Sequence, residues 1–372
     1  MASVVGSLRR NDCIRLLLVL CLLQSMGCPT PSRKAETPKP SNPSATSDKL
    51  FVFEDVTLKL GIQHTVRNGE ESKHFSILES MGSGLASFDF DRDGRDDLFF
   101  TGGGDIQNKQ LHGVTSSLWI NRQGNFANVT LPAGVPASRF YTQGVSHGDI
   151  DNDGFLDFIV SGYGGIQLFK NQGDGTFVEI TMNAGIVESN WSTSVAFGDF
   201  DNDGNLDVYI VNYVDWSWDN HPLCGTAERP KVCDPGAFGP IAGSVYFSDG
   251  QGSFLKSEKD SGLGEVGRGL GIMVADFTQD DQVDVYIAND TTNNHFYENL
   301  GKGRFQEIGT LSGTATDSNG LPEGSMGVCT LDFNGDLLPD IWVCNYESQA
   351  FALYRNDGSS NFKYYTPSAG LL

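Results

Sequence analysis

The chain has 372 residues, of which 47 are acidic and 25 basic, and it carries a formal net charge of −22. A charge of this sign excludes nonspecific nucleic-acid binding, which needs a basic surface. Glycine contributes 45 residues and no segment has a convincing amphipathic helical period, so strands joined by many turns are expected.

The first 28 residues have the pattern of a signal peptide. Arg9, Arg10 and Arg15 precede the apolar run LLLVLCLLQSMGC, which is too short to span a membrane comfortably but is typical of an export signal. Because the small residue Gly27 precedes Cys28, we predict a lipoprotein signal with Cys28 as the lipidated residue. Ordinary cleavage after Gly27 stays open, since the leucine usual three residues before such a cysteine is missing.

Residues 29–48 are rich in Pro, Ser and Thr without apolar content, and they predict a tether in front of a folded domain at residues 49–372. No segment other than the signal could span a bilayer, so the membrane would be reached only through the lipid anchor. The predicted location is the outer surface or the periplasm for a bacterial lipoprotein, and outside the cell otherwise.

The central motif is GDFDNDGNLDVYIVNY, residues 198–213, in which three aspartates occupy alternate positions before a glycine. These aspartates would repel one another without a cation among them. Ca²⁺ takes about six to eight oxygen ligands, and an alternating acidic run around a sharp turn supplies three. The predicted ligands are Asp199, Asp201, Asp203 and Asp207, together with the backbone carbonyl of Asn205.

This loop differs from an EF-hand, which needs a glutamate at the twelfth position and helices on both sides. Counted from Asp199, the twelfth residue is Ile210, which lies in a β-branched and aromatic run. The closing acid, Asp207, is at position nine instead. The loop is therefore predicted to join two strands.

The acidic motif occurs five times, beginning at Asp89, Asp149, Asp199, Asp276 and Asp332. A single copy would also fit an acidic turn without an ion, but repetition favours Ca²⁺ sites. The first two copies offer Asp89, Asp91, Asp93, Arg95 and Asp97, and then Asp149, Asp151, Asp153, Phe155 and Asp157, with Arg95 and Phe155 contributing carbonyls.

The fourth and fifth copies are eroded, since Thr278 and Asn334 replace the acid at position three. We therefore expect three strong Ca²⁺ sites and two that are weaker or lost. The candidate ligands of the last two are Asp276, Asp280, Asp284, Asp332, Asn334, Asp336 and Asp340.

A second motif alternates with the first and reads, for example, SLWINRQGNFANVT from Ser117 and HFYENLGKGRFQEIG from His295. An apolar strand, a polar turn and a strand led by Phe are the signature of a hairpin. One repeat then has two hairpins. Four-stranded units of about 55 residues predict an all-β fold, a β-propeller with the acidic loops on one rim.

The acidic loops resemble those of FG-GAP (VCBS-type) repeats, the blades of the integrin α-subunit propeller. The stretches ILESMGSGLASFDFDRDG, WSTSVAFGDFDNDGNLDVYIVNYV, LCGTAERPKVCDPGAF and VDVYIANDTTNNHFYENLGKGRF resemble the cartilage acidic protein/UnbV-like propeller family. The resemblance covers roughly residues 51–371 and implies further repeats and a short C-terminal module. It also implies that one propeller face contacts a ligand.

The phase of the repeat predicts a ring that is incomplete at its C-terminal side. FVFEDVTLKLGI, residues 51–62, is a copy of the segment that follows the second hairpin elsewhere, and the chain stops at the same point of the fifth repeat. A ring closed through the N-terminal strand would need another acidic hairpin after Leu372. We expect a truncated chain, and a complete five-bladed ring with residues 51–62 as a lead-in stays open.

Residues 214–241 form an insertion in the third repeat. Cys224 and Cys233 lie close together in it and predict a disulfide, worth about 2 to 3 kcal/mol for so short a loop. Trp216, Trp218 and His221 make the insertion either a site for carbohydrate or protein contact or a lid over the propeller face.

Two further cysteines flank the fifth acidic loop. Cys329 lies three residues before Asp332 and Cys344 four after Asp340, so a hairpin closed by those acids would set them nearly opposite. A cross-strand disulfide and two buried thiols both stay open.

The predicted function is an exported, membrane-tethered, calcium-binding propeller that serves as a surface binding, adhesion or scaffold module for an unidentified protein or carbohydrate. No catalytic constellation is found, so an enzyme is not expected. The alternative is an enzyme or enzyme-accessory protein in which calcium is structural. GVSHG, residues 144–148, fits G-x-S-x-G around Ser146, but it is in register with SVAFG at 194–198 and no helix follows.

Overall fold

A computed structural model describes residues 53–257 and 261–371. Within them the chain forms five four-stranded antiparallel sheets, three two-stranded sheets and a few short helical turns. None of the helices in these ranges is long and apolar enough to cross a membrane. The predicted signal peptide, Cys28 and the tether at residues 29–48 lie outside the described residues.

Each four-stranded sheet takes two strands from an acidic hairpin and two from the hairpin that follows, as the repeat predicts, and we number these blades 1 to 5 in chain order. The blades consist of β1 (Leu85–Phe88), β2 (Asp97–Phe100), β5 (Ser117–Asn121) and β6 (Phe126–Asn128); β7 (Tyr141–Gly148), β8 (Asp157–Tyr163), β9 (Gly165–Asn171) and β10 (Phe177–Glu179); β11 (Ser192–Gly198), β12 (Asp207–Asn212), β16 (Ser244–Ser248) and β17 (Phe254–Lys256); β19 (Gly269–Ala275), β20 (Asp284–Asn289), β21 (His295–Asn299) and β22 (Phe305–Glu307); and β23 (Ser325–Leu331), β24 (Asp340–Asn345), β25 (Ala352–Asn356) and β26 (Phe362–Tyr364).

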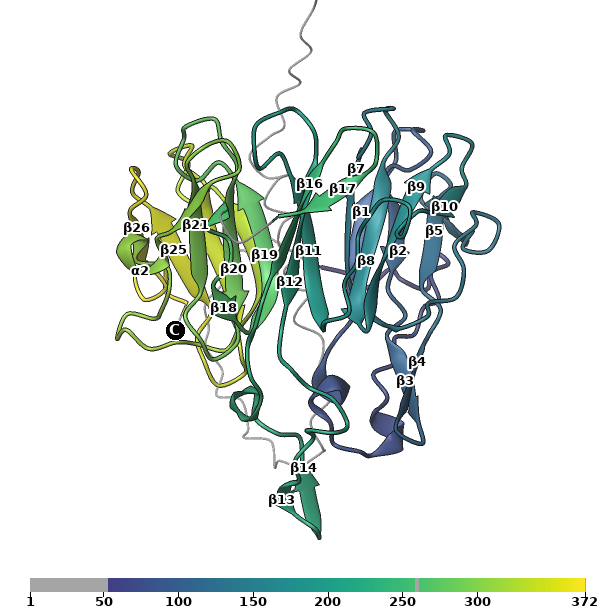
Figure 1. Cartoon of the computed structure of the whole chain (residues 1–372), viewed down its shortest axis with the longest axis horizontal. Helices are drawn as coiled ribbons and strands as arrows, with labels where there is room; N and C mark the ends of the chain where they lie inside the picture. Colours follow the sequence, from purple (N-terminus) through teal and green to yellow (C-terminus); the bar gives the residue numbers. More distant parts are fainter. Residues whose placement is uncertain (1–52, 258–260, 372) are drawn as a thin grey trace, which may run out of the picture.

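The blades stand side by side in chain order, with their first strands packed on one another (Figure 1). Because blades 3 and 4 are covered on both faces, their second strands β12 and β20 are buried along their whole length. Aromatic rings fill the space between blades 1 and 2, where Phe158 has the rings of Phe99 and Phe169 each at 4.7 Å. In the described part of the chain β23 does not pack on β1 as neighbouring blades do, so the row is open. The predicted propeller of four-stranded blades is confirmed.

A buried asparagine at the end of the third strand ties a blade to the one before it. In blade 4, Asn299 Nδ2 donates to the carbonyl of Phe200 in the acidic loop of blade 3 at 3.1 Å, and to the Val283 carbonyl of its own blade at 3.0 Å. Its Oδ1 accepts from the Gly301 amide at 2.9 Å. The acidic loop is therefore part of the contact between blades.

Asn171 and Asn356 make the same set of bonds in blades 2 and 5. Blade 3 has Ser248 at this position, and its shorter side chain accepts from the Gly250 amide at 3.1 Å. The link between blades 2 and 3 is thus built differently from the other links.

Residues 214–241 leave blade 3 between β12 and β16 and cover the end of the blades opposite the acidic loops (Figure 1). Short elements gather at this end or in the connections between blades: β13 (Cys224–Thr226), β14 (Arg229–Lys231), η3 (Pro235–Ala237), β15 (Ile241–Ala242), β18 (Val266–Gly267), β3 (Gly104–Gln107), β4 (Gln110–Gly113), η1 (Glu70–Ser72), η2 (Ile77–Ser80) and α2 (Gly309–Ser312).

The insertion is anchored by Trp216, which is 3% exposed. Its ring lies 5.3 Å from that of Tyr163 and 6.2 Å from that of Trp191, and the Tyr163 hydroxyl donates to its carbonyl at 3.0 Å. Cys224 and Cys233 form the predicted disulfide. These contacts favour the lid interpretation for Trp216 itself, because its ring is part of a core, whereas Trp218 is only half-buried.

The predicted alignment of Cys329 with Cys344 is wrong. Asp340 pairs with Leu331, which places Cys329 opposite Trp342 and leaves Cys344 two residues farther along β24. The two cysteines form no disulfide and both thiols are buried. Counting from the acids failed because the turn of the loop contains more residues than the prediction assumed.

We expect Asn299→Ala to lower the free energy of unfolding by about 2 to 4 kcal/mol, because it removes three hydrogen bonds from a side chain that is 1% exposed. Ser248→Ala is the matched control at the equivalent position, with an expected loss of about 1 kcal/mol. Urea denaturation compares the two variants. Equal losses would contradict the role of the asparagine between blades.

Candidate metal centres

The five acidic loops occupy one end of the blades, each between the first and second strand. Positions are counted from the first aspartate, so position nine is the first residue of the second strand. Neighbouring loops touch: Asn152 Nδ2 donates to Asn205 Oδ1 at 3.3 Å, and the Arg92 guanidinium lies over the Phe155 ring at 5.2 Å. Loops 1 to 3 are therefore in contact, and the five loops together make an acidic rim at this end of the blades.

The acid at position nine is buried and held by two backbone amides in every loop. Asp207, 1% exposed, accepts from the Phe200 amide at 2.9 Å through Oδ2 and from the Ser248 amide at 2.8 Å through Oδ1. The equivalent bonds are made by Asp97, Asp157, Asp284 and Asp340. This acid therefore joins the loop to the third strand, a role that the sequence did not predict. A carboxylate that accepts two N–H bonds still has lone pairs with which it can bind a cation.

The acids at positions one and five are also met by backbone amides. Asp199 accepts from the amides of Asp203 at 3.0 Å and Gly204 at 2.9 Å, and Asp203 accepts from the Asn205 amide at 2.9 Å. The other four loops make the same bonds, including the two eroded ones. The carbonyl ligands predicted at position seven, from Arg95, Phe155 and Asn205, stay a prediction.

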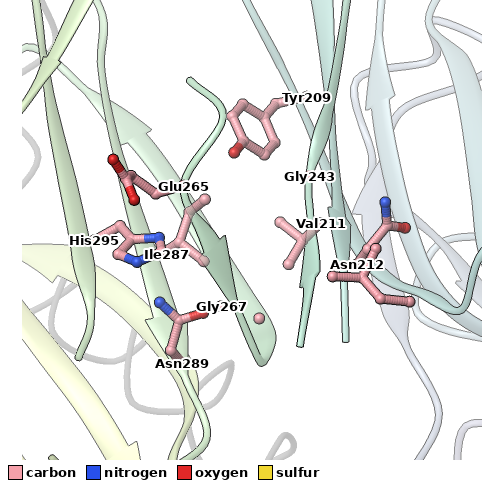
Figure 2. A pocket seen from close by; sticks show the side chains of 11 residues that line it. Tyr209, Val211, Asn212, Gly243, Glu265, Gly267, Ile287, Asn289 and His295 are labelled. Atoms are coloured by element: carbon pink, nitrogen blue, oxygen red, sulfur yellow. The ribbon is translucent and has the colours of Figure 1, made fainter. Parts of the chain in front are cut away.

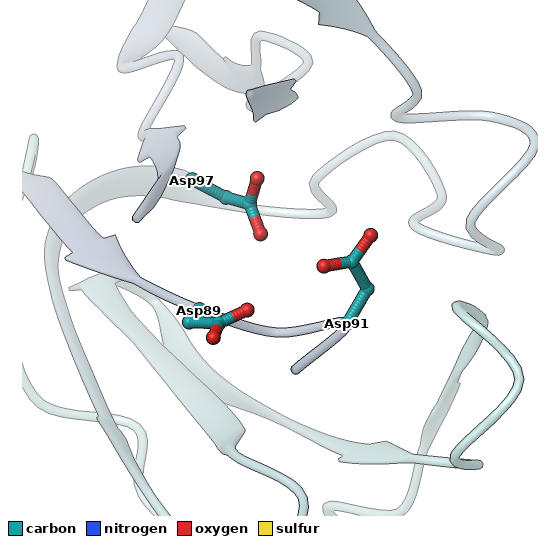
Figure 3. Close-up of side chains that lie close together, drawn as sticks. All are labelled: Asp89, Asp91 and Asp97. Carbon is teal, nitrogen blue, oxygen red and sulfur yellow. The ribbon is translucent and has the colours of Figure 1, made fainter. Parts of the chain in front are cut away.

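In the first three loops the acidic side chains converge, and Figure 3 shows the three of loop 1 around a common space. Ligand atoms within 4.8 Å of one another come from Asp89, Asp91 and Asp97; from Asp149, Asp151 and Asp157; and from Asp199, Asp201 and Asp203. Each cluster could hold a metal ion. In the described ranges loops 4 and 5 bring no three acids so close together.

In loops 2 and 3 the acid at position three has an oxygen without a partner. Asp151 Oδ1 and Asp201 Oδ1 are both buried with no hydrogen bond, and the Asp151 side chain is only 10% exposed. Burial, followed by the nearby Asp203 carboxylate, raises the pKa of Asp201 above its ordinary value. An unsatisfied buried carboxylate oxygen is costly. This donor set, all oxygen and negatively charged, fits a hard divalent cation.

Basic side chains distinguish the three clusters. Arg95 pairs with Asp93 in loop 1, and Lys170 pairs with Asp151 and Asp153 in loop 2. The position-five acids Asp93 and Asp153 stay outside their clusters, whereas Asp203 in loop 3 joins its own. Among the described residues no Lys or Arg forms an ion pair with loop 3.

The acids at position nine carry raised pKa values because they are buried. Desolvation raises the pKa of Asp97 to about 6 and those of Asp157, Asp207 and Asp284 to about 7. Neighbouring loop acids add to the rise, and the two amide donors oppose it. At neutral pH each loop is therefore under electrostatic stress that a bound cation would relieve.

A pocket between blades 3 and 4 lies away from the acidic rim, with Glu265 and His295 on one side and Tyr209 and Val211 on the other (Figure 2). It encloses about 10 Å³, room for about one water molecule. The adjoining cavity of about 190 Å³ is lined by Glu265, Asn293, Asn294, His295, Glu307 and Thr310. Burial lowers the pKa of His295 to about 4, so its imidazole is neutral.

Ser146, the serine of the G-x-S-x-G match, lies inside β7 with Ile159 opposite it in β8. A nucleophile elbow needs a sharp turn from strand to helix at the serine. The neighbouring His147 stacks on Phe88 at 4.9 Å. The local geometry therefore differs from that of the hydrolase motif.

The family model described as FG-GAP-like repeat matches residues 89–160, 149–210 and 276–343, together just over half of the chain. Each match begins at the first aspartate of an acidic loop. Cartilage acidic protein 1 of Xenopus tropicalis is 24% identical over 294 residues, which cover 74% of this chain and 41% of that protein. The chain thus spans less than half the length of this relative.

Among solved structures, an Agrocybe aegerita lectin that recognises non-reducing terminal N-acetylglucosamine is similar with a TM-score of 0.40 and 18% identity, over 75% of this chain and 64% of the lectin. The V. cholerae biofilm matrix protein Bap1 is similar with a TM-score of 0.38 and 12% identity, over 76% of this chain and 38% of Bap1. Because these TM-scores are low, the fold assignment is based on the sheet topology described above and not on these similarities.

Stability in metal-free buffer should fall as the pH rises from about 4 to about 7. The folded-state pKa values of Asp157, Asp207 and Asp284 lie above the unfolded value, so the native state binds more protons in this window and the slope of stability against pH is negative. Thermal unfolding at pH 5 and pH 7.5 measures the sign. A higher Tm at pH 7.5 in metal-free buffer would contradict the stress assigned to these acids.

Position six of every loop has a left-handed backbone, with φ of 90° at Gly204 but also 70° at Leu337. Leu337→Gly should raise the free energy of unfolding by about 0.5 to 1 kcal/mol, because leucine is strained at positive φ. Leu337 is 83% exposed, so little packing is lost. Gly204→Ala is the reverse control and should destabilise by a similar amount in urea; a destabilising Leu337→Gly would refute the strain.

Proposed function

The chain belongs to the FG-GAP-like repeat family, and from this premise we propose that it is an exported, calcium-binding β-propeller that acts as a surface binding, adhesion or scaffold module. The observation that carries the proposal is the convergence of acids in the first three loops, with buried oxygens of Asp151 and Asp201 that lack a partner. The proposal assigns no catalytic step to the protein.

Calcium is the proposed ion because the donors are carboxylates on a loop. Ca²⁺ prefers oxygen ligands and tolerates irregular geometry, whereas Mg²⁺ demands a near-octahedral set and keeps several waters. The loop carbonyls of Arg95, Phe155 and Asn205 would complete the shells. Softer metals are disfavoured, since the clusters contain neither sulfur nor imidazole.

The expected binding free energy gives calcium a structural role, in which it stabilises the folded state. Extracellular modules bind Ca²⁺ with a Kd of roughly 10⁻⁴ to 10⁻³ M, so about 1 mM calcium contributes about 0.4 to 1.4 kcal/mol per site. Three such sites add a few kcal/mol, a sizeable part of the roughly 5 to 15 kcal/mol that separates folded from unfolded domains. Binding would also relieve the stress on the buried acids at position nine.

Export is supported by the disulfide between Cys224 and Cys233, because structural disulfides persist in oxidising compartments. In the proposal the signal peptide directs export, Cys28 carries the lipid and residues 29–48 hold the propeller away from the membrane. No further contact with the membrane is assigned.

The partner is proposed to be a protein or a carbohydrate, met at the lid end of the blades. The hairpin β13–β14 projects from this end (Figure 1), and Leu223 beside it is 70% exposed. Trp218 lies half-buried at 4.9 Å from Trp216 and presents an aromatic ring near this surface. A net charge of −22 disfavours nucleic acid as the partner.

Removal of calcium should lower the Tm, and Asp201→Asn should abolish one site, because Asp201 supplies the unpartnered oxygen of loop 3. Asp336→Asn is the matched control in the eroded loop 5 and should change the calcium stoichiometry little. Calorimetric titration of the two variants measures the number of ions. An unchanged wild-type Tm after chelation, or equal losses in the two variants, would refute the proposal.

A further inference from the structure

One basic side chain reaches the acidic loop of its blade from the third strand. The Lys170 ammonium in β9 pairs with Asp151 Oδ2 and lies 3.5 Å from Asp153 Oδ2. The Lys170 side chain is 31% exposed and that of Asp151 10% exposed. In a half-buried setting the ammonium therefore pairs with one carboxylate of the loop 2 cluster and with a second acid beside that cluster.

The equivalent residue in each other blade leaves its loop acids alone. In each blade this position comes one residue before the third-strand residue whose amide donates to the acid at position nine. The residues found there in blades 1, 3, 4 and 5 are Ile120, Phe247, Glu298 and Arg355. Arg355 is basic as well, but it pairs with Asp357 and lies over the Tyr365 ring at 4.8 Å. Lys170 is thus a feature of blade 2.

The ammonium satisfies this loop incompletely. It pairs with Asp151 Oδ2, while Asp151 Oδ1 stays buried without a partner. Three donors on one nitrogen cannot replace the six or more oxygen contacts of a divalent ion. The loop keeps the donor set of a cation site although a cationic side chain already lies in it.

We propose that Lys170 is a built-in competitor for the divalent cation of loop 2. This inference rests on the calcium binding proposed above and concerns how one of its sites is regulated. Without metal, the ammonium reduces the repulsion between Asp151 and Asp153. A metal ion must displace the ammonium, so loop 2 binds it more weakly than loop 3, where no basic side chain competes in the described structure.

The consequence is a graded response along the acidic rim. Loop 3 fills at lower calcium concentrations, and loop 2 fills later and releases Lys170. In loop 1 Arg95 pairs with Asp93 alone, while Asp89, Asp91 and Asp97 remain together, so the guanidinium competes less directly there. Adjacent loops touch through Asn152 and Asn205, so the late filling of loop 2 would complete the rim between blades 2 and 3.

The test isolates loop 2 in the full chain by the substitutions Asp91→Asn and Asp201→Asn, which disable the other two complete loops. Calorimetric titration with CaCl₂ then compares Lys170→Met with Lys170 in this background. Removal of one positive charge next to a divalent ion should tighten binding about tenfold. Lys170→Arg, which keeps the charge, should bind as the lysine does.

Two controls make the result specific. Lys256→Met removes an equal charge from the pair with Glu188, far from the loops in sequence, and should leave the affinity unchanged. Addition of Asp151→Asn should abolish calcium binding in this background, as the equivalent substitutions do in loops 1 and 3, which assigns the measured affinity to loop 2. Circular dichroism of each variant confirms that it is folded.

The outcomes separate the two proposals. An unchanged or weaker affinity of Lys170→Met, in a protein that binds calcium, would overturn the competitor role and leave calcium binding intact. Calcium binding that persists with Asp151→Asn would place the gain outside loop 2 and would also overturn it. Absence of calcium binding in the unmodified chain would overturn the proposed function and this inference with it.

Discussion

The hydrogen bonds of the buried aspartate that ends each acidic loop hold the propeller together. Its two oxygens join the loop to the third strand, as Asp207 does with the amides of Phe200 and Ser248. In blades 2, 4 and 5 the asparagine beside this junction reaches the loop of the preceding blade, as Asn299 reaches Phe200. The acidic loops therefore join strands within a blade and also join neighbouring blades. Because each loop contains a buried carboxylate, a cation bound nearby would stabilise the folded state.

Local sequence patterns predicted most of this architecture. The recurring aspartates and the Phe-led hairpins predicted four-stranded blades, and the nine-residue separation of Cys224 and Cys233 predicted their disulfide, because these features depend on nearby residues. The opposition of Cys329 and Cys344 was predicted wrongly, since strand register depends on how the loop turns, and the loop sets Leu331 opposite Asp340. Hairpin β3–β4 was missed because its turn residues Asn108 and Lys109 adopt positive φ values without the glycine that usually marks a two-residue hairpin turn.

Contacts between distant residues were beyond the reach of sequence reasoning. The Asn299 side chain bonds a backbone carbonyl of blade 3, and the Lys170 side chain pairs with that of Asp151; both contacts arise only when the blades are formed. These contacts also explain why loops with nearly the same sequence differ in how their acidic side chains are paired. The loop acids supply the oxygen ligands for a cation. The basic side chain beside a loop determines how many of these oxygens are already paired. In the proposed function the metal-binding rim and the partner-binding lid lie at opposite ends of the blades, so the first can stabilise the fold without blocking the second.

The central claim is that a cation on the acidic rim stabilises the bonds of the buried aspartates. Hydrogen exchange of the Phe200 and Ser248 amides at pH 7.5, with and without calcium, tests it most directly, because both amides donate to Asp207. Faster exchange of these two amides is expected in metal-free buffer, while the Trp216 amide of the lid, bonded to Val214 at 3.0 Å, keeps its protection. Equal protection of Phe200 and Ser248 in both buffers would contradict it.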